Sequence, residues 1–243
     1  MSRFLFVHGS WHGAWCWDLV AKRLTAAGHM VRAIDLPGHG NDARNPEDVT
    51  LAHYSAAVRA EILDMGGSVI LVGHSMGGVV ISAASELIPD GISKLVFIAA
   101  LIPQENDTLV DLTEKHIPEP RLLDQAVQPE GLVGHLNQDI AHELFYTDLS
   151  EQTAKGLIEK LSPQPLMPLM TPVQITAENF GALPKTYIEC TRDKTIPIGA
   201  QRAMLRAAKI SDVVSLQSAH SPFISMPDQL ANILKSLEKT QAA

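Results

Sequence analysis

Residues 69–87 read VILVGHSMGGVVISAASEL, and this stretch decides the predicted fold. An apolar run leads into GHSMG at residues 73–77, which matches G-x-S-x-G, and a helical pattern follows. In that motif a serine lies on a sharp strand-to-helix turn with its hydroxyl exposed at a sheet edge. We predict that Ser75 is a nucleophile; the alternative is an ordinary turn with a capping serine. Nucleotide binding is not expected, because G-x-G-x-x-G and G-x-x-x-x-G-K-[ST] are both absent.

The flanking chain alternates short apolar runs, typical of buried strands, with longer segments of helical spacing. The predicted strands are Arg3–His8, Met30–Asp35, Ser68–Gly73, Lys94–Ala100, Lys185–Cys190 and Asp212–Gln217. The predicted core helices are Ala14–Ala27, Leu51–Met65, Ser75–Leu87, Pro197–Ala208 and Pro227–Lys239. Near-continuous apolar strands that alternate with helices indicate a parallel sheet covered on both faces. We therefore predict an α/β core, a mostly parallel six-stranded sheet, formed by residues 1–102 and 186–243.

The middle of the chain, residues 103–185, interrupts the alternation. It holds nine of the 15 prolines, and its clearest helical patterns are Asn137–Tyr146 and Glu151–Leu161. A stretch of this length is uncommon as a plain loop. We predict that residues 103–185 form an inserted helical lid over the core.

Composition excludes several classes of protein. The 19 basic and 27 acidic residues give a net charge of −8, so binding to nucleic acid or to an anionic membrane surface is not expected. The two cysteines, Cys16 and Cys190, are too few for a disulfide framework or a zinc site. No apolar stretch reaches the ~20 residues that span a bilayer. We expect a cytoplasmic globular protein without metal or cofactor; a homodimer is one option that the sequence leaves open.

A serine nucleophile needs a base and an acid at the same sheet edge. His220 lies between the last predicted strand and the last predicted helix, which favours it as the base over a plain solvated loop histidine. Asp193 directly follows the strand that ends at Cys190, and the order serine, aspartate, histidine is the one expected for this architecture. Asp107 and Glu105 are less favoured alternatives for the acid.

Two backbone N–H groups should face the developing oxyanion. Met76 follows the nucleophile and supplies one; the loop after the first strand supplies the other, and we predict Ser10, because Gly9 lets that backbone turn close to the substrate. Trp11 and His12 in the same loop are predicted to face the pocket.

Beyond these motifs, nearly the whole chain resembles one known family. FVHGSWHGAWCW, AAGHMVRAIDLPGHG, LVGHSMGG, YIECTRDKTIPIGAQRAML and SAHSPFISMPDQLANIL resemble the methylesterase and hydroxynitrile lyase group of the α/β-hydrolase fold, and among its members the bacterial carboxylesterases that hydrolyse pyrethroids. The resemblance implies Ser75, Asp193 and His220 as a triad, with the Ser10 and Met76 N–H groups as the oxyanion hole. Hydroxynitrile lyases of this group carry a threonine or asparagine and a lysine where this chain has Gly9 and Ser221.

These observations favour a serine carboxylesterase that hydrolyses small to medium apolar esters through an acyl-enzyme. The lid is expected to supply specificity through its apolar residues Phe145, Tyr146, Leu166, Met167, Leu169 and Met170. Of these, Phe145, Tyr146, Met167 and Met170 are predicted to contact substrate, together with Gly9; packing of the lid residues onto the core is the alternative. Two other functions stay open: a hydroxynitrile lyase with the same triad, and a non-catalytic receptor for a small molecule.

Overall fold

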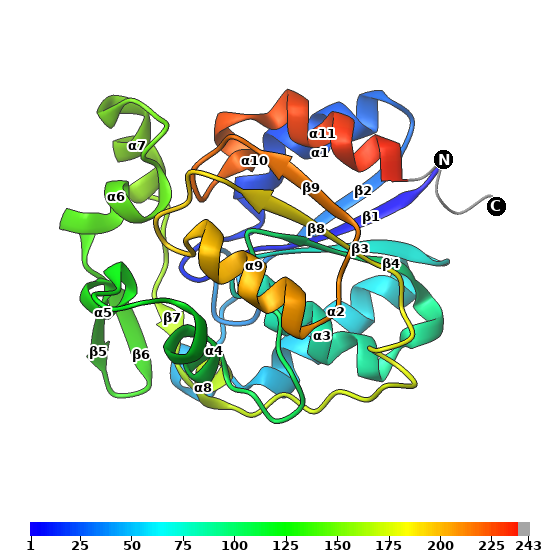
Figure 1. Ribbon diagram of the computed structural model, residues 1–243, viewed down its shortest axis with the longest axis horizontal. Coiled ribbons are helices and arrows are strands. Elements are labelled where there is room, and N and C mark those ends of the chain that lie inside the picture. Colours follow the sequence, from blue (N-terminus) through cyan, green and yellow to red (C-terminus); the bar gives the residue numbers. More distant parts are fainter. Residues whose placement is uncertain (238–243) are drawn as a thin grey trace.

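The computed structural model describes residues 1–237, and a six-stranded sheet forms its centre (Figure 1). The strands are β1 (Arg3–Val7), β2 (Met30–Ile34), β3 (Val69–His74), β4 (Ile92–Ile98), β8 (Lys185–Cys190) and β9 (Val213–Leu216). They lie in the order β2-β1-β3-β4-β8-β9, and every neighbouring pair is parallel. The predicted parallel sheet is therefore confirmed.

Helices cover both faces of this sheet because successive strand residues point to opposite sides. In β1, Phe4 and Phe6 pack on one side, and Leu5 and Val7 pack on the other. The first side is covered by α1 (Asp18–Ala26), α10 (Pro222–Ser225) and α11 (Pro227–Ser236), and the second by α2 (Leu51–Asp64), α3 (Gly77–Leu87) and α9 (Ile198–Ala207) (Figure 1). Lys239, the predicted end of the last helix, lies outside the described residues. None of the helices in residues 1–237 is long and apolar enough to cross a membrane.

The topology brings the candidate residues to one edge of the sheet. Because all six strands run parallel, their carboxyl ends meet at the same edge. The chain passes from β1 outward to β2 and then returns to the other side of β1 as β3, so the strand order reverses between β1 and β3. Ligand sites of open α/β sheets form at such a reversal, outside the carboxyl ends of the strands.

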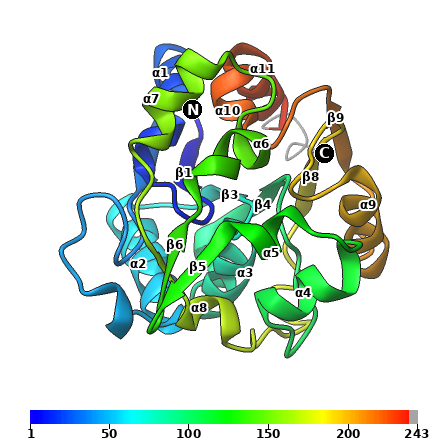
Figure 2. The same ribbon diagram turned by 90° about the vertical axis from the view of Figure 1, so that its left-hand side faces the viewer.

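The insertion between β4 and β8 lies across this edge and faces the viewer in Figure 2. As predicted, it contains helices: α4 (Leu109–His116), α5 (Leu122–Ala126), α6 (Ala141–Phe145), α7 (Glu151–Ile158) and α8 (Met167–Met170). It also contains a three-stranded antiparallel sheet that the sequence did not predict, made of β5 (Val127–Glu130), β6 (Val133–Leu136) and β7 (Gln164–Pro165). These strands have four, four and two residues, too few for a period of two to be visible.

The end of the insertion belongs structurally to the core. Val173, Ile175 and Phe180 are buried in the same hydrophobic cluster as α2 and α3. Glu86 on α3 accepts hydrogen bonds from the backbone N–H groups of Thr176 and Phe180, at 2.7 and 3.0 Å. Those bonds lower the pKa of the Glu86 carboxyl, against a desolvation that raises it. Residues 173–180 thus attach the insertion to the face of the sheet that α2 and α3 cover, and not to the edge where the strands end.

Candidate active site

Ser75 lies on the turn between β3 and α3 in a left-handed conformation, with φ of +53°. Such a conformation is strained for a residue with a side chain and persists only when its surroundings hold it. Here the Ser75 N–H donates to Ile98 O at 3.3 Å, and Ser75 O accepts from Leu101 N–H at 3.1 Å. The turn is so tight that a Cβ on Gly73 would lie 2.6 Å from Gly77 O. The motif glycines are therefore a steric requirement of the turn.

His220 and Asp193 meet at the same sheet edge, in the loops after β9 and β8. His220 Nδ1 lies 2.7 Å from Asp193 Oδ2, and both side chains are buried. The other carboxylate oxygen, Oδ1, accepts the backbone N–H groups of Thr195 at 2.8 Å and Ile196 at 3.0 Å. Asp107, the alternative acid, instead accepts from Gln104 N–H and pairs with Lys115.

His74, the residue before Ser75 in the motif, links the Ser75 turn to the loop that carries His220. His74 Nε2 lies 2.8 Å from the carbonyl oxygen of His220, so Nε2 carries the hydrogen and donates it. Burial lowers the pKa of His74 well below its usual value, which keeps the ring neutral. Within residues 1–237, neither His220 Nε2 nor Ser75 Oγ has a hydrogen-bond partner. Nε2 is therefore the ring nitrogen that is free to take a proton. In structures without substrate, the hydrogen bond between a catalytic serine and its histidine is often long or unformed.

The loop after β1 presents the Ser10 amide beside Ser75. The Gly9 carbonyl accepts His8 Nδ1–H at 2.8 Å, and His8 Nε2 accepts Leu36 N–H at 3.0 Å, which fixes the tautomer. Burial lowers the pKa of His8 to about 4, so this ring is neutral at pH 7. With the Gly9 carbonyl held on one side of the peptide, the Ser10 N–H points to the other side. In the described part of the chain, the amides of Ser10 and Met76 donate no hydrogen bond to protein.

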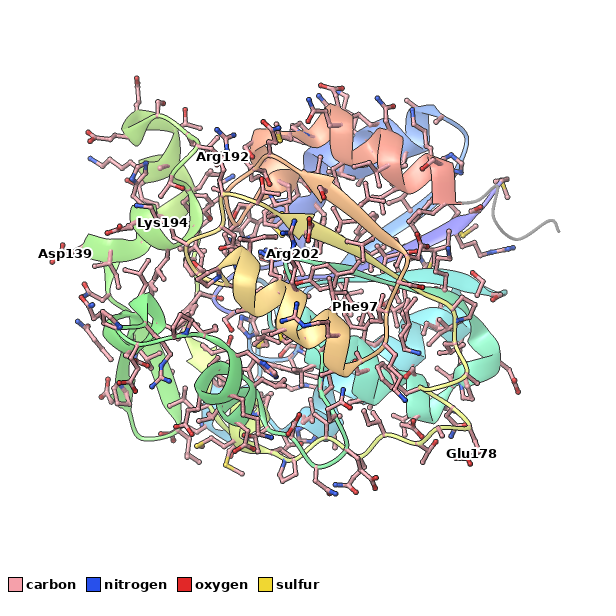
Figure 3. All side chains as sticks on the ribbon, in the orientation of Figure 1. Phe97, Asp139, Glu178, Arg192, Lys194 and Arg202 are labelled. Carbon is pink, nitrogen blue, oxygen red and sulfur yellow. The ribbon has the colours of Figure 1, made fainter. Side chains whose placement is uncertain are left out.

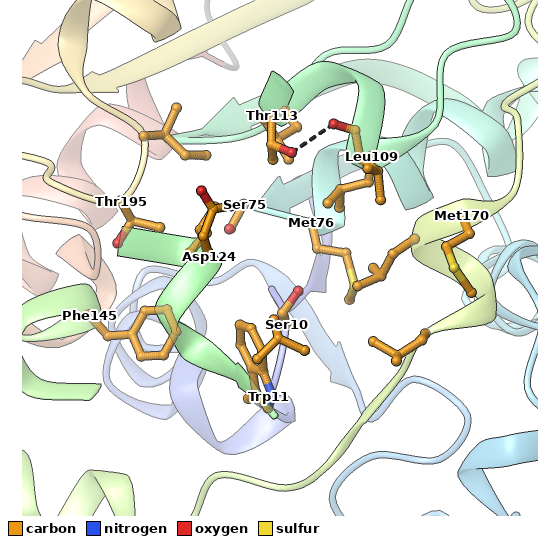
Figure 4. Close-up of a pocket in the computed structure, with 17 residues that line it drawn as sticks. Ser10, Trp11, Ser75, Met76, Leu109, Thr113, Asp124, Phe145, Met170 and Thr195 are labelled. Carbon is orange, nitrogen blue, oxygen red and sulfur yellow. Dashed lines mark hydrogen bonds between the residues drawn. The ribbon is translucent and has the colours of Figure 1, made fainter. Parts of the chain in front are cut away.

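Ser75 opens into a cavity of about 310 Å³ beneath the insertion (Figure 4). Six of the residues predicted for the site line it: Ser10, Trp11, Ser75, Met76, Phe145 and Met170. Leu166 and Leu169, two of the apolar lid residues expected to set specificity, also line it. The other walls come from residues that were not predicted for the site: Leu101, Leu109, Val110, Thr113, Leu123, Asp124, Val127, Thr195 and Ile196. Asp124 is the one ionisable side chain among these 17 lining residues, and Arg121 Nε donates to it at 3.0 Å.

Four residues predicted to contact substrate do not line this cavity. A Cβ on Gly9 would lie 2.9 Å from Ser75 Cβ, so Gly9 permits close approach of two loops instead. His12 and Tyr146 are fully buried and bonded to each other, His12 Nε2 to the Tyr146 hydroxyl at 2.9 Å. Met167 misses the cavity because Leu166, Leu169 and Met170 have the i, i+3, i+4 spacing of one helix face and Met167 does not.

Some of the cavity residues that were not predicted could have been identified from their positions in the sequence. Leu101 follows β4, and Thr195 and Ile196 follow β8, so each lies just past a carboxyl end at the sheet edge. The edge rule that selected Asp193 therefore also selects them. The lining residues of α4, α5 and β5 do not follow a strand of the main sheet, so the sequence gives no sign of their position. Only the packing of the insertion turns them toward Ser75.

Two ion pairs involve residues that do not line the cavity. Lys194, in the loop after β8, bonds Glu143 of α6 at 2.9 Å, and Arg202 of α9 bonds Glu189 at 2.8 Å; Figure 3 labels Lys194 and Arg202. Both partners of the Lys194 pair are about half exposed, where an ion pair contributes little. No group of three or more His, Cys, Asp or Glu side chains in residues 1–237 is arranged to hold a metal ion.

Comparison with known proteins agrees with this architecture. The model of the alpha/beta hydrolase family matches residues 4–233, so the chain belongs to that family. It is 31% identical to methylesterase 1 of Arabidopsis thaliana, over 98% of this chain and 97% of the relative. It is also 31% identical to salicylic acid-binding protein 2 of Nicotiana tabacum, over 98% of both chains.

A solved structure of a pyrethroid hydrolase from Sphingobium faniae JZ-2 superposes with a TM-score of 0.89 at 28% identity, over 99% of this chain and 98% of that one. Polyneuridine aldehyde esterase superposes with a TM-score of 0.87 at 25% identity, over 98% and 99% of the two chains. Within the family, this chain is therefore placed in the methylesterase-like group.

Proposed function

We propose that the protein is a serine carboxylesterase that acts on neutral, apolar esters through an acyl-enzyme. The observation that carries the proposal is the 2.7 Å bond between His220 Nδ1 and Asp193 Oδ2 beside the strained Ser75 turn. That bond leaves Nε2 as the basic nitrogen, with no other protein partner in the described residues to compete for it.

In the proposed reaction, Ser75 Oγ transfers its proton to His220 Nε2 and attacks the ester carbonyl carbon. The Ser10 and Met76 N–H groups, which have no protein acceptor in the described chain, hydrogen-bond the oxyanion. His220 then gives the proton to the leaving alcohol, and an acyl-Ser75 ester remains. A water molecule attacks that ester by the same route, with His220 as base, and frees the acid. Asp193 stabilises the imidazolium in both halves.

The cavity supports a neutral substrate. No basic side chain is among its 17 lining residues, and the single ionisable one, Asp124, is acidic. A carboxylate placed among these apolar walls loses hydration without gaining a cationic partner. Leucine, valine and methionine side chains from α4, α5 and α8 instead offer apolar contacts to an acyl or alkoxy group.

The reaction class is tested with p-nitrophenyl esters from acetate to octanoate, on the wild type beside Ser75→Ala. We expect turnover in the wild type and a fall in kcat of about 10⁴-fold or more in the variant. Intact-protein mass spectra of wild type quenched during turnover should show the added acyl mass, and Ser75→Ala should not. A folded variant with near-normal activity would contradict the assignment of the nucleophile.

The substrate class has its own test. p-Nitrophenyl butyrate and mono-p-nitrophenyl succinate have the same leaving group and similar length, but the second carries a terminal carboxylate. We expect kcat/KM at least tenfold higher for butyrate, and an equal or reversed preference would refute the neutral-ester assignment. A wild type without ester turnover that releases cyanide from mandelonitrile would be a lyase, and one that only binds ligand would be a receptor.

A further inference from the structure

A five-residue segment of the insertion, residues 144–148, contacts three loops that carry proposed catalytic groups: those of Ser10, Asp193 and His220. It begins in the last turn of α6 and continues just beyond it. Leu144 O accepts the Thr195 hydroxyl at 2.6 Å, the Tyr146 hydroxyl bonds His12 at 2.9 Å, and Asp148 Oδ2 accepts Ala219 N–H at 3.0 Å. We infer that residues 144–148 are a positioning clamp that sets the geometry of the acid, oxyanion and base loops, an inference that rests on the proposed serine mechanism.

Tyr146 acts on the oxyanion loop through His12. His12 Nδ1 lies 2.9 Å from Ser10 O, and because a carbonyl oxygen only accepts, Nδ1 carries the hydrogen. Burial lowers the pKa of His12 to about 3, so the neutral ring has Nε2 free to accept, and the Tyr146 hydroxyl is the donor. The bridge therefore holds the carbonyl of Ser10, the same residue whose N–H is proposed to bind the oxyanion.

Asp148 acts on the base loop. Ala219, whose N–H it accepts, directly precedes His220. The second carboxylate oxygen, Oδ1, is buried and has no partner within residues 1–237. An unpaired buried polar atom costs free energy and calls for a reason in a native structure. Holding the Ala219 amide, and with it the backbone of the proposed base, is such a reason.

Leu144 acts on the acid loop through its backbone. The Thr195 hydroxyl that it accepts belongs to the residue whose N–H donates to Asp193 Oδ1 at 2.8 Å. Between the clamp residues, Phe145 lines the cavity and faces the rings of Trp11 and His220, with centroids 5.9 Å apart in each case. One segment thus forms a wall of the substrate cavity and holds all three loops around it.

The test compares Asp148→Ala and Tyr146→Phe with a matched surface change, Glu143→Gln, which breaks the exposed pair to Lys194 on the same stretch of chain. Activity is measured on p-nitrophenyl butyrate and stability by urea unfolding. We expect kcat to fall at least tenfold in the first two variants while KM changes less than threefold. Glu143→Gln should stay within twofold of wild type in both constants.

Asp148→Asn keeps an oxygen that can accept Ala219 N–H, so it should recover most of the activity lost in Asp148→Ala. Tyr146→Phe keeps the ring volume, which leaves the test available if Asp148→Ala does not fold. Folded variants with unchanged kcat, or with only a raised KM, would overturn the clamp and leave residues 144–148 as a pocket wall. Failure of the serine mechanism is separate, because it would appear as an active Ser75→Ala.

Discussion

The exchange Asp193→Asn tests how the acid controls the base. Oδ1 of Asp193 accepts two backbone N–H groups, from Thr195 and Ile196, and only an oxygen can take that position. The side-chain oxygen of the asparagine must therefore stay there, and its NH₂ must face His220 Nδ1. That NH₂ donates, so Nδ1 has to accept, and the ring hydrogen moves to Nε2. An imidazole with a hydrogen on Nε2 cannot take the proton of Ser75.

We expect kcat to fall about 10⁴-fold, as in serine triads where the same exchange fixes the wrong tautomer. That loss corresponds to about 5.5 kcal/mol of transition-state stabilisation. The assay is steady-state hydrolysis of p-nitrophenyl butyrate at pH 7, with circular dichroism to establish that the variant is folded. Asp107→Asn is the control, because this buried carboxylate bonds Lys115 and Gln104 instead of the proposed base.

Asp193→Ala separates the tautomer from the lost charge. Alanine leaves His220 free to adopt either tautomer, so the alanine variant should be at least as active as the asparagine variant, provided that both are folded. A folded Asp193→Asn within tenfold of the wild-type kcat would refute the reasoning. So would an asparagine variant that is clearly more active than the alanine variant.

Two further predictions concern specificity and acid stability. Met170→Ala should move the preferred acyl chain toward longer p-nitrophenyl esters, whereas Met167→Ala, outside the cavity, should not; equal shifts in both would refute the cavity assignment. Burial lowers the pKa values of His8, to about 4, and of His12, to about 3, and those of His39 and His74 in the same direction. Below pH 6.5 the unfolded chain then binds more protons than the folded one, so stability falls as pH falls. The His8 and His12 rings each lower the free energy of unfolding by about 1 kcal/mol between pH 6.5 and 5.5, about 2 kcal/mol together, and His39 and His74 act in the same direction. Urea unfolding at the two pH values measures this, and a change under 1 kcal/mol would contradict it.

Local patterns in the sequence were sufficient for the sheet and for the positions of the proposed triad. Apolar runs predicted all six strands of the main sheet. The four inner strands, β1, β3, β4 and β8, are buried along most of their length on both faces, whereas the edge strands β2 and β9 are partly exposed. Ser75, Asp193 and His220 each follow a strand, and parallel strands bring their carboxyl ends together. The structure has these residues at that edge; their catalytic roles stay predictions.

The sequence by itself therefore determined the α/β core, the strained serine turn and the residues that gather at the sheet edge. Only the tertiary structure decided which side chains face the cavity. Four residues predicted to contact substrate, Gly9, His12, Tyr146 and Met167, do not line it. The tertiary structure also showed the small sheet in the insertion and the contacts of residues 144–148. The physical reason is distance along the chain: the Tyr146 hydroxyl and His12 are 134 residues apart, and Asp148 and Ala219 are 71 apart. Local propensity does not encode such pairs, because they exist only once the insertion packs on the core.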